Sequence, residues 1–160
     1  MGFVWRDYSP EAMGYIENWL DDVAIKSTGL DNGFRDFYEY YWANEDGFVV
    51  GQNFWCKVIF ENDEPIACIA FCYHECKITI MEFVVKPEKR SQGNGSKVLK
   101  QLFECKEIIG LDIQKSEAVI FPNNIASKRA FENAGFKYHH THEDGDASYY
   151  VYDNSFNQSI

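Results

Sequence analysis

The chain has 160 residues, of which 46% are hydrophobic and 17% aromatic, and its formal net charge is −10. This length and apolar content suit one compact domain with a sizeable core. No uncharged apolar run approaches the roughly twenty residues that span a bilayer, and the first residues lack the pattern of a signal peptide. We therefore expect a cytoplasmic protein that does not bind membranes.

The N-terminal third of the chain predicts one short strand and two helices. Phe3–Arg6 has the pattern of an edge strand, and Ser9-Pro10 is typical of a helix start. Apolar residues then recur at helical spacing, so this helix should run to about Lys26. A second helix is expected over Phe34–Ala43, with so many aromatic rings that some of them should face a groove.

The middle of the chain predicts a sheet of mixed strand direction. Three apolar runs with short connections indicate antiparallel strands over Phe54–Phe60, Ile66–Tyr73 and Ile78–Lys86. A helix over Gly95–Ile109 and a buried strand over Glu117–Phe121 follow, and this strand-helix-strand order implies a parallel pair between the third run and Glu117–Phe121. Near the end, Phe136–His142 and Ser148–Asp153 predict a hairpin. The expected fold class is α/β, with a mixed sheet and helices on both faces.

The five cysteines are an odd number without a CxxC pair, which favours free thiols in a reducing cytoplasm. No histidine motif accompanies any of them, so we do not expect a covalent route through Cys105 or another thiol. Two clusters suggest metal binding, Cys72-x-His74-x-Cys76 and His139-His140-x-His142. Adjacent histidines on a strand should point to opposite faces, however, and we predict no metal site.

The charge is unevenly distributed along the chain. Residues 1–50 hold ten acids and three bases, residues 138–160 hold four acids and no base, and residues 51–137 hold eleven acids and twelve bases. Acidic flanks would attract a cationic partner, or they would only keep an aromatic-rich surface soluble. The bases concentrate at Lys86, Lys89, Arg90, Lys97 and Lys100, as a polyphosphate ligand requires. Nucleic acid is not expected as a partner, because no basic stripe lies elsewhere.

The basic segment also contains a glycine-punctuated turn between a strand and a helix. Gly93 and Gly95 lack Cβ atoms, so the backbone there can bring its N–H groups close to an anion. The helix that follows adds its positive N-terminal end. Thirty residues later, Asn124 begins a short amphipathic helix that is closed by Gly135 in the C′ position.

Together these segments resemble the GNAT superfamily of acetyl-CoA-dependent N-acetyltransferases. Arg90, Gly93 and Gly95 match the family's Gln/Arg-x-x-Gly-x-Gly/Ala signature, and a second helix motif is matched by Asn124, Ser127, Gly135 and Phe136. The tyrosine that is usual in that helix is Phe131 here. The resemblance covers roughly Phe54 to Tyr152. It implies a GNAT-like fold, a central and mostly antiparallel sheet with a splayed parallel strand pair.

The resemblance also implies that residues 1–160 form a single N-acetyltransferase domain whose segments have different roles. Residues 1–50 would form the acceptor side, residues 54–137 the acetyl-CoA-binding core, and residues 136–153 a closing hairpin. In the family the strand before the glycine turn bulges and parts from its parallel neighbour, and pantetheine inserts there. A main-chain N–H at the bulge, by analogy that of Val84 or Val85, would stabilise the developing oxyanion.

The coenzyme contacts that the resemblance implies come from three segments. Backbone amides would contact the diphosphate and the pantetheine, and Asn124, Ser127 and Phe131 would line the coenzyme's path. The expected coenzyme-binding residues are Phe83, Val84, Val85, Arg90, Ser91, Gln92, Gly93, Asn94, Gly95, Ser96, Asn124, Ser127 and Phe131. Asn124 could instead be only an N-cap, and Ser127 and Phe131 only packing residues.

Acetyl transfer to an amine raises two proton problems. An alkylammonium with a pKa of about 10.4 must lose a proton before it can attack. Glu82 is the acid within the apolar third strand, and burial there would raise its pKa, although it could also be a paired or rim residue. The departing thiolate benefits from a proton that Phe131 cannot donate. Tyr138, Tyr149 and Tyr150 are candidate donors, Tyr138 first among them, and solvent is another.

The resemblance therefore implies an acetyl-CoA-dependent N-acetyltransferase that acts by direct attack in a ternary complex. The expected acceptor is a small cationic primary amine, such as a polyamine or an aminoglycoside. A protein N-terminus or lysine is the rival acceptor, and a coenzyme-A-binding module without turnover is the third alternative. A homodimer is compatible with the resemblance.

Overall fold

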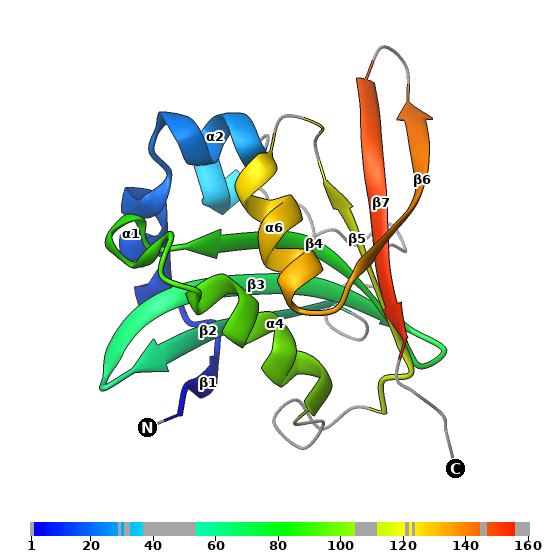
Figure 1. The fold of residues 1–160 in the computed structure, drawn as a ribbon. Coiled ribbons are helices and arrows are strands. Elements are labelled where there is room, and N and C mark those ends of the chain that lie inside the picture. The colour runs from blue at the N-terminus through cyan, green and yellow to red at the C-terminus, as the bar shows by residue number, and fades with distance from the viewer. Residues whose placement is uncertain are drawn as a thin grey trace.

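The fold is a mixed α/β fold, as the sequence predicts. The computed structural model describes residues 2–28, 30, 33–36, 54–104, 112–120, 122, 124–144 and 147–155. Within this part of the chain, seven strands form one sheet in the order β1-β2-β3-β4-β5-β7-β6. Helices pack on both faces of the sheet (Figure 1).

Neighbouring strands are antiparallel at every position of the sheet except one. The antiparallel run begins with β1 (Val4–Asp7), β2 (Phe54–Glu61), β3 (Glu64–His74) and β4 (Lys77–Val85). It resumes with β5 (Lys115–Ile120), β7 (Ala147–Ser155) and β6 (Lys137–Asp144). β4 and β5 are parallel, which confirms the predicted parallel pair.

Two tight turns connect β2 to β3 and β3 to β4. Asn62 and Asp63 have φ values of 51° and 64°, and Glu75 and Cys76 have φ values of 48° and 63°. Two consecutive residues with positive φ match a type I′ turn, whose twist suits the flanking strands. These hairpins hold the centre of the sheet together.

The first predicted helix is wrong as a single element. The chain forms α1 (Pro10–Trp19) and α2 (Asp22–Thr28) instead. Leu20 ends α1 with φ −84° and ψ 74°, outside the helical region. The Asp21 carboxylate then accepts a hydrogen bond from the Ala24 amide at 2.9 Å and so caps α2. As a result Val23, which apolar spacing would place on the packed face of a single helix, is 67% exposed.

Among the described elements, α4 and α6 cover one face of the sheet, and α1 and α2 lie on the opposite face. α4 (Asn94–Glu104) and α6 (Ile125–Asn133) lie in contact over a core that includes Ile69 and Leu99, both fully buried (Figure 1). On the opposite face α1 packs over Val58 and Ala70, and α2 contacts β4. Of the aromatic helix predicted over Phe34–Ala43, residues 37–43 lie outside the described part of the chain, as do residues 105–111 after α4.

A β-bulge interrupts β4 at Met81. Pairing with β3 shifts there, because Ala70 is opposite Glu82 while Phe71 is opposite Ile80. Parallel pairing with β5 also ends at Ile80, although β5 continues to residue 120, and the two strands diverge from that point (Figure 1). The predicted divergence of the two parallel strands is therefore confirmed. The bulge, however, is not at Val84 or Val85 as expected, since both pair regularly with β3.

A second bulge, in β6, places two histidines side by side. Tyr138 and His140 have successive partners on β7, so His139 is the extra residue. The Nδ1 atoms of His139 and His140 are 2.6 Å apart, and the expectation that the rings point to opposite faces is wrong because the bulge breaks the alternation. Within the described residues no three His, Cys, Asp or Glu side chains are placed to hold a metal ion.

The described cysteines Cys56, Cys68, Cys72 and Cys76 are all free thiols, and Cys105 lies outside the described residues. Among the helices that the structure describes, none has the length and apolar character needed to cross a bilayer.

Candidate active site

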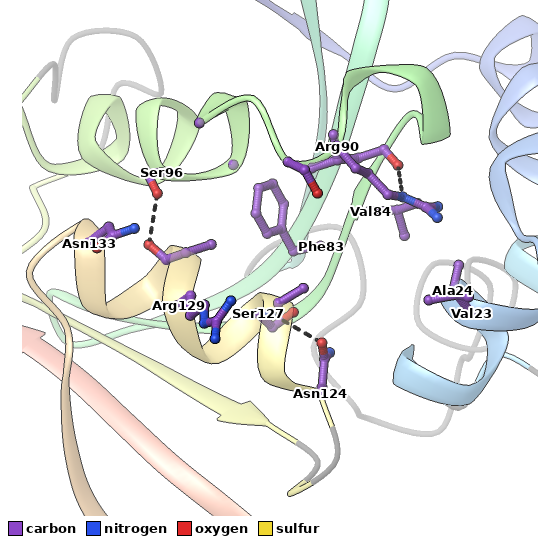
Figure 2. A pocket seen from close by; sticks show the side chains of 16 residues that line it. Val23, Ala24, Phe83, Val84, Arg90, Ser96, Asn124, Ser127, Arg129 and Asn133 are labelled. Carbon is purple, nitrogen blue, oxygen red and sulfur yellow. Dashed lines mark hydrogen bonds between the residues drawn. The ribbon is translucent and has the colours of Figure 1, made fainter.

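A pocket of about 540 Å³ opens where β4 ends and parts from β5. Its lining comes from the end of β4, the turn after it, the first turn of α4, α6 with its N-cap, and α2 (Figure 2). In chain order the lining residues are Val23, Ala24, Phe83, Val84, Val85, Arg90, Ser91, Gly93, Gly95, Ser96, Asn124, Ala126, Ser127, Arg129, Ala130 and Asn133. The structure therefore brings together most of the residues that the two motifs predict.

The turn after β4 presents backbone amides to this pocket. A 3₁₀ turn, η1 (Pro87–Lys89), leads to Ser91 and Gly93, whose φ values are 59° and 81°. A Cβ atom at Gly93 would meet nothing within 4 Å, so the space above the turn is open. In the first turn of α4 the amide of Lys97 donates to the Gly93 carbonyl at 3.1 Å, while the amides of residues 94–96 have no acceptor within the helix. Such a turn favours an anion.

Close packing between α4 and α6 forms the base of the pocket. A Cβ atom at Gly95 would lie 3.5 Å from the Ala130 Cβ, and Ser96 Oγ donates to the Ala130 carbonyl at 3.3 Å (Figure 2). At the start of α6, Asn124 Oδ1 accepts a hydrogen bond from the Ser127 amide at 3.1 Å. Asn124 is therefore an N-cap, and it lines the pocket as well.

Three cations between β4 and the glycine turn are paired with acids of the same chain, whereas Lys97 in the first turn of α4 is exposed. Lys86 Nζ lies 2.6 Å from Glu64 Oε1, and Lys89 Nζ lies 3.6 Å from Glu64 Oε2. Arg90 Nη1 lies 2.9 Å from Asp21 Oδ2. These three side chains therefore have carboxylate partners within the chain, and the expectation that the basic segment serves a polyphosphate stays a prediction.

Arg129 is a pocket residue that sequence reasoning missed. It lies on the pocket side of α6, is exposed, and among the described residues forms no ion pair. The lining positions 126, 129, 130 and 133 recur at a spacing of three to four residues, the spacing of one helix face. That periodicity, started from Ala126, would have identified Arg129.

Phe131 lies behind the pocket wall rather than in it. Its side chain is 2% exposed and packs edge-on against Phe83 and Phe136, with ring centroids 6.3 Å and 4.8 Å away. Of this trio only Phe83 lines the pocket. The packing role that the sequence left open for Phe131 is thus the one that the geometry supports.

Three further predicted residues lie away from the pocket lining. Gln92 Nε2 donates to the Glu88 carbonyl at 2.7 Å, and Asn94 Nδ2 donates to the Lys89 carbonyl at 2.9 Å, so both side chains hold the turn itself. Tyr138 is 52% exposed on β6, and its hydroxyl lies 2.5 Å from Thr141 Oγ1. The structure does not bring Tyr138 to the pocket, and the side chains of Tyr149 and Tyr150 lie outside the described part of the chain.

Glu82 projects to the face of the sheet that α1 and α2 cover. Ala70, which pairs with Glu82 on β3, belongs to the core on that face, and so does Val84, two residues after Glu82. Phe83, between Glu82 and Val84, packs against the core on the other face. Burial raises the pKa of the Glu82 carboxyl well above its usual value. Among the described residues it forms no ion pair that would offset this rise. A carboxyl in such a position holds a proton to higher pH than a surface glutamate.

The thiols near Glu82 are poorly suited to act as nucleophiles. Cys68 Sγ lies 3.6 Å from Cys56 Sγ in the buried core under α1. Burial, followed by the neighbouring Cys56 and Glu82, raises the pKa of the Cys68 thiol well above its usual value. A protonated thiol is a weak nucleophile, so Cys68 is poorly suited to attack an acyl group.

Comparison with known proteins identifies the family. Residues 36–138 match the family model described as "Acetyltransferase (GNAT) domain". No curated protein matches the sequence significantly. Since the match spans more than half of the chain, the protein belongs to the GNAT family of acetyltransferases, as the two motifs indicated.

Solved structures share the fold at low sequence identity. The aminoglycoside acetyltransferase AAC(6')-Ib in complex with coenzyme A superimposes with a TM-score of 0.76 and 15% identity, over 97% of this chain and 95% of that one. The ribosomal-protein-S18-alanine N-acetyltransferase from Escherichia coli gives a TM-score of 0.68 and 12% identity, over 99% and 97%. At these identities the likeness establishes the fold alone.

The chain is thus an acetyltransferase, and the acyl donor of this family is acetyl-CoA. The pocket fits such a donor in three respects. It has an open turn of amides at a helix N-terminus, apolar walls from Phe83 and Val84, and a volume within the usual range for small-molecule sites.

Proposed function

We propose that the protein transfers the acetyl group of acetyl-CoA to the primary amine of a small cationic acceptor, by direct attack in a ternary complex. The observation that carries this proposal is the position of Glu82. Its carboxyl lies on the α1 and α2 face of β4, next to Phe83, whose ring lines the pocket from the opposite face. Donor and acceptor would then approach from opposite faces and meet where β4 and β5 part.

The site residues have separate roles in this proposal. Bound acetyl-CoA supplies an activated acyl group. The amides of residues 91–96 would hold its diphosphate, and Asn124 and Ser127 would lie along its pantetheine arm. Main-chain groups of Phe83, Val84 and Val85 would pair with that arm in place of a strand, because β5 leaves their edge of β4 free beyond Ile80.

Glu82 would solve the first proton problem. An alkylammonium has a pKa of about 10.4, so at neutral pH it needs a base before its nitrogen can attack. A carboxylate with a raised pKa is a stronger base than an ordinary glutamate, and it would take that proton directly or through a water. The same carboxylate would attract a cationic acceptor into the site.

A thiol-release assay over a panel of acceptors tests the proposal. The panel should contain polyamines, aminoglycosides, neutral aromatic amines and peptides with a free N-terminus or lysine. We expect release of coenzyme A with the small cationic amines and a much lower kcat/KM with the peptides. Turnover restricted to peptides would establish a protein acetyltransferase instead. Calorimetric binding of acetyl-CoA without any turnover would indicate a coenzyme-binding module.

A further inference from the structure

Arg90 connects three segments through its guanidinium group. Nε donates to the Val85 carbonyl at 3.0 Å, which is the last residue of β4. Nη2 donates to the Trp19 carbonyl at 3.0 Å, and Nη1 donates to both Asp21 oxygens at 3.1 and 2.9 Å. All three nitrogens of the group therefore have partners within the chain. Figure 2 marks the hydrogen bond between Arg90 and the Val85 carbonyl with a dashed line.

The Asp21 end of this contact fixes a wall of the pocket. Asp21 caps α2 through the Ala24 amide, and its carbonyl accepts from the Ile25 amide at 2.9 Å. Val23 and Ala24 line the pocket, with the α6 residues on its other side (Figure 2). The Ala24 amide first, and Arg90 after it, lower the pKa of Asp21, so the carboxylate is charged at neutral pH. The pair thus joins α2 to the start of the glycine turn.

We infer that Arg90 is a positioning residue, which holds α2 against the glycine turn so that both walls of the coenzyme pocket are in place before the coenzyme binds. It is not the counter-ion of the diphosphate, because its carboxylate partner already balances its charge. This inference depends on the proposed assignment of the pocket to acetyl-CoA. The role of phosphate cation falls instead to Arg129, the exposed guanidinium on the opposite side of the pocket.

Calorimetric titration with acetyl-CoA and with desacetyl coenzyme A tests the inference. The variants are Arg90→Ala, Arg90→Lys, Asp21→Ser and the double variant of Arg90→Ala with Asp21→Ser, each measured at about 0.02 and 0.3 M salt. Serine retains the N-cap of α2 but removes both oxygens from Arg90. Arg129→Gln is the comparison for a direct phosphate contact. Thermal unfolding of each variant confirms that it is folded.

We expect Arg90→Ala and Asp21→Ser each to raise the Kd of both ligands about tenfold, as loss of a charge-assisted pair can. The Kd of the double variant should be no more than about twofold above that of the single variant that binds more weakly, because both substitutions remove the same contact. Arg90→Lys should bind almost as weakly as Arg90→Ala, since lysine lacks the planar fork. The salt dependence of Kd should be unchanged in the Arg90 variants and reduced in Arg129→Gln.

Other results would overturn the inference. Normal or tighter binding by Asp21→Ser together with weak binding by Arg90→Ala would make Arg90 a direct phosphate ligand. So would wild-type affinity in Arg90→Lys, or a reduced salt dependence in Arg90→Ala. If Arg90→Ala does not fold, Arg90→Lys and Asp21→Ser decide the question. Failure of the wild type to bind either ligand would refute the pocket assignment itself, which is a separate result.

Discussion

At the scale of single residues, the surroundings of a side chain decide its chemistry more than its type does. Glu82 and Glu64 lie on neighbouring strands, yet burial raises the pKa of Glu82, while hydrogen bonding to Lys86 and the charge of Lys86 lower the pKa of Glu64. Glu82 is therefore suited to accept a proton, whereas Glu64 is suited to hold two lysines in place. The difference comes from the ion-pair partners of Glu64, which Glu82 lacks among the described residues.

Glu82→Gln should lower kcat by about 10²–10⁴-fold, the usual contribution of a general base. The acid limb of the pH–rate profile should disappear with it. In the wild type that limb should lie above the ordinary glutamate range, because the pKa of Glu82 is raised. Glu132→Gln, an exposed change on α6, is the matched control and should leave both the rate and the profile unchanged. Unaltered turnover in Glu82→Gln would remove this carboxyl from the mechanism.

The same substitution should stabilise the fold at neutral pH. Glu82 keeps its proton to higher pH in the folded chain than in the unfolded chain, so between the two pKa values the unfolded state binds fewer protons. The free energy of unfolding therefore falls as pH rises through that window. Glutamine cannot ionise, so the variant should not lose this stability. We expect Tm at pH 8 to rise by about 2–4 °C for each kcal/mol relieved, with little change at pH 4. A lower Tm at pH 8 would show that the carboxylate is stabilised by contacts.

At the scale of elements, the glycine turn depends on backbone conformation more than on space. Gly93 has φ 81°, which L-residues adopt at a cost of roughly 1–2 kcal/mol, while a Cβ atom there would meet nothing within 4 Å. A side chain at this position would extend into the open space above the turn. Two separate consequences follow, one for stability and one for ligand binding.

Gly93→Ala should lower the free energy of unfolding by about 1 kcal/mol and Gly93→Asn by less, because asparagine tolerates positive φ. Gly93→Glu should abolish binding of acetyl-CoA, since it adds a carboxylate where the diphosphate is expected. Gly14→Ala is the control, because Gly14 lies in α1 with open space around it and should gain about 0.5–1 kcal/mol. Denaturant unfolding and calorimetry measure the two effects. Full coenzyme affinity in Gly93→Glu would mean that the glycine turn does not bind the diphosphate.

The elements that the sequence predicts well are those that local pattern determines. Apolar runs and short connections were enough for β2, β3 and β4, and the helix between two strands was enough for the parallel pair. The break at Leu20 was missed because helical apolar spacing continues across it. Both bulges were misjudged, since the extra residue at Met81 or His139 is defined only by the partner strand.

In the candidate site, too, local motifs are predictable from the sequence, whereas contacts between distant segments are not. Its glycines and the Asn124 helix are local motifs, and the structure places both at one pocket. The pairing of Arg90 with Asp21 joins residues 69 positions apart, so no pattern along the chain could reveal it. The sequence suggests Tyr138 only through its hydroxyl group, and its exposed position on β6 depends on how the strands pair.

At the scale of the whole molecule, the charge distribution separates two kinds of partner. Residues 1–50, whose described part includes β1, α1 and α2, hold ten acids and three bases, while residues 51–137 are nearly neutral. Lys86, Lys89 and Arg90 are paired with carboxylates, while Lys97 and Arg129 are exposed, so the positive field near the pocket is weaker than the sequence suggests. An anionic coenzyme would thus depend on local amides, and a cationic acceptor on the long-range field of the acidic segment.

Raising the ionic strength from about 0.01 to 0.15 M should lower kcat/KM for a cationic acceptor several-fold at saturating acetyl-CoA, because the screening length shrinks from about 30 to 8 Å. A neutral aromatic amine should show almost no change. Neutralising two exposed acids of residues 1–50, Glu11→Gln with Asp22→Asn, should weaken the salt dependence, whereas Glu75→Gln with Glu132→Gln, two exposed acids elsewhere, should have a smaller effect. Equal salt dependence for charged and neutral acceptors would show that the acidic segment serves solubility and does not steer the acceptor.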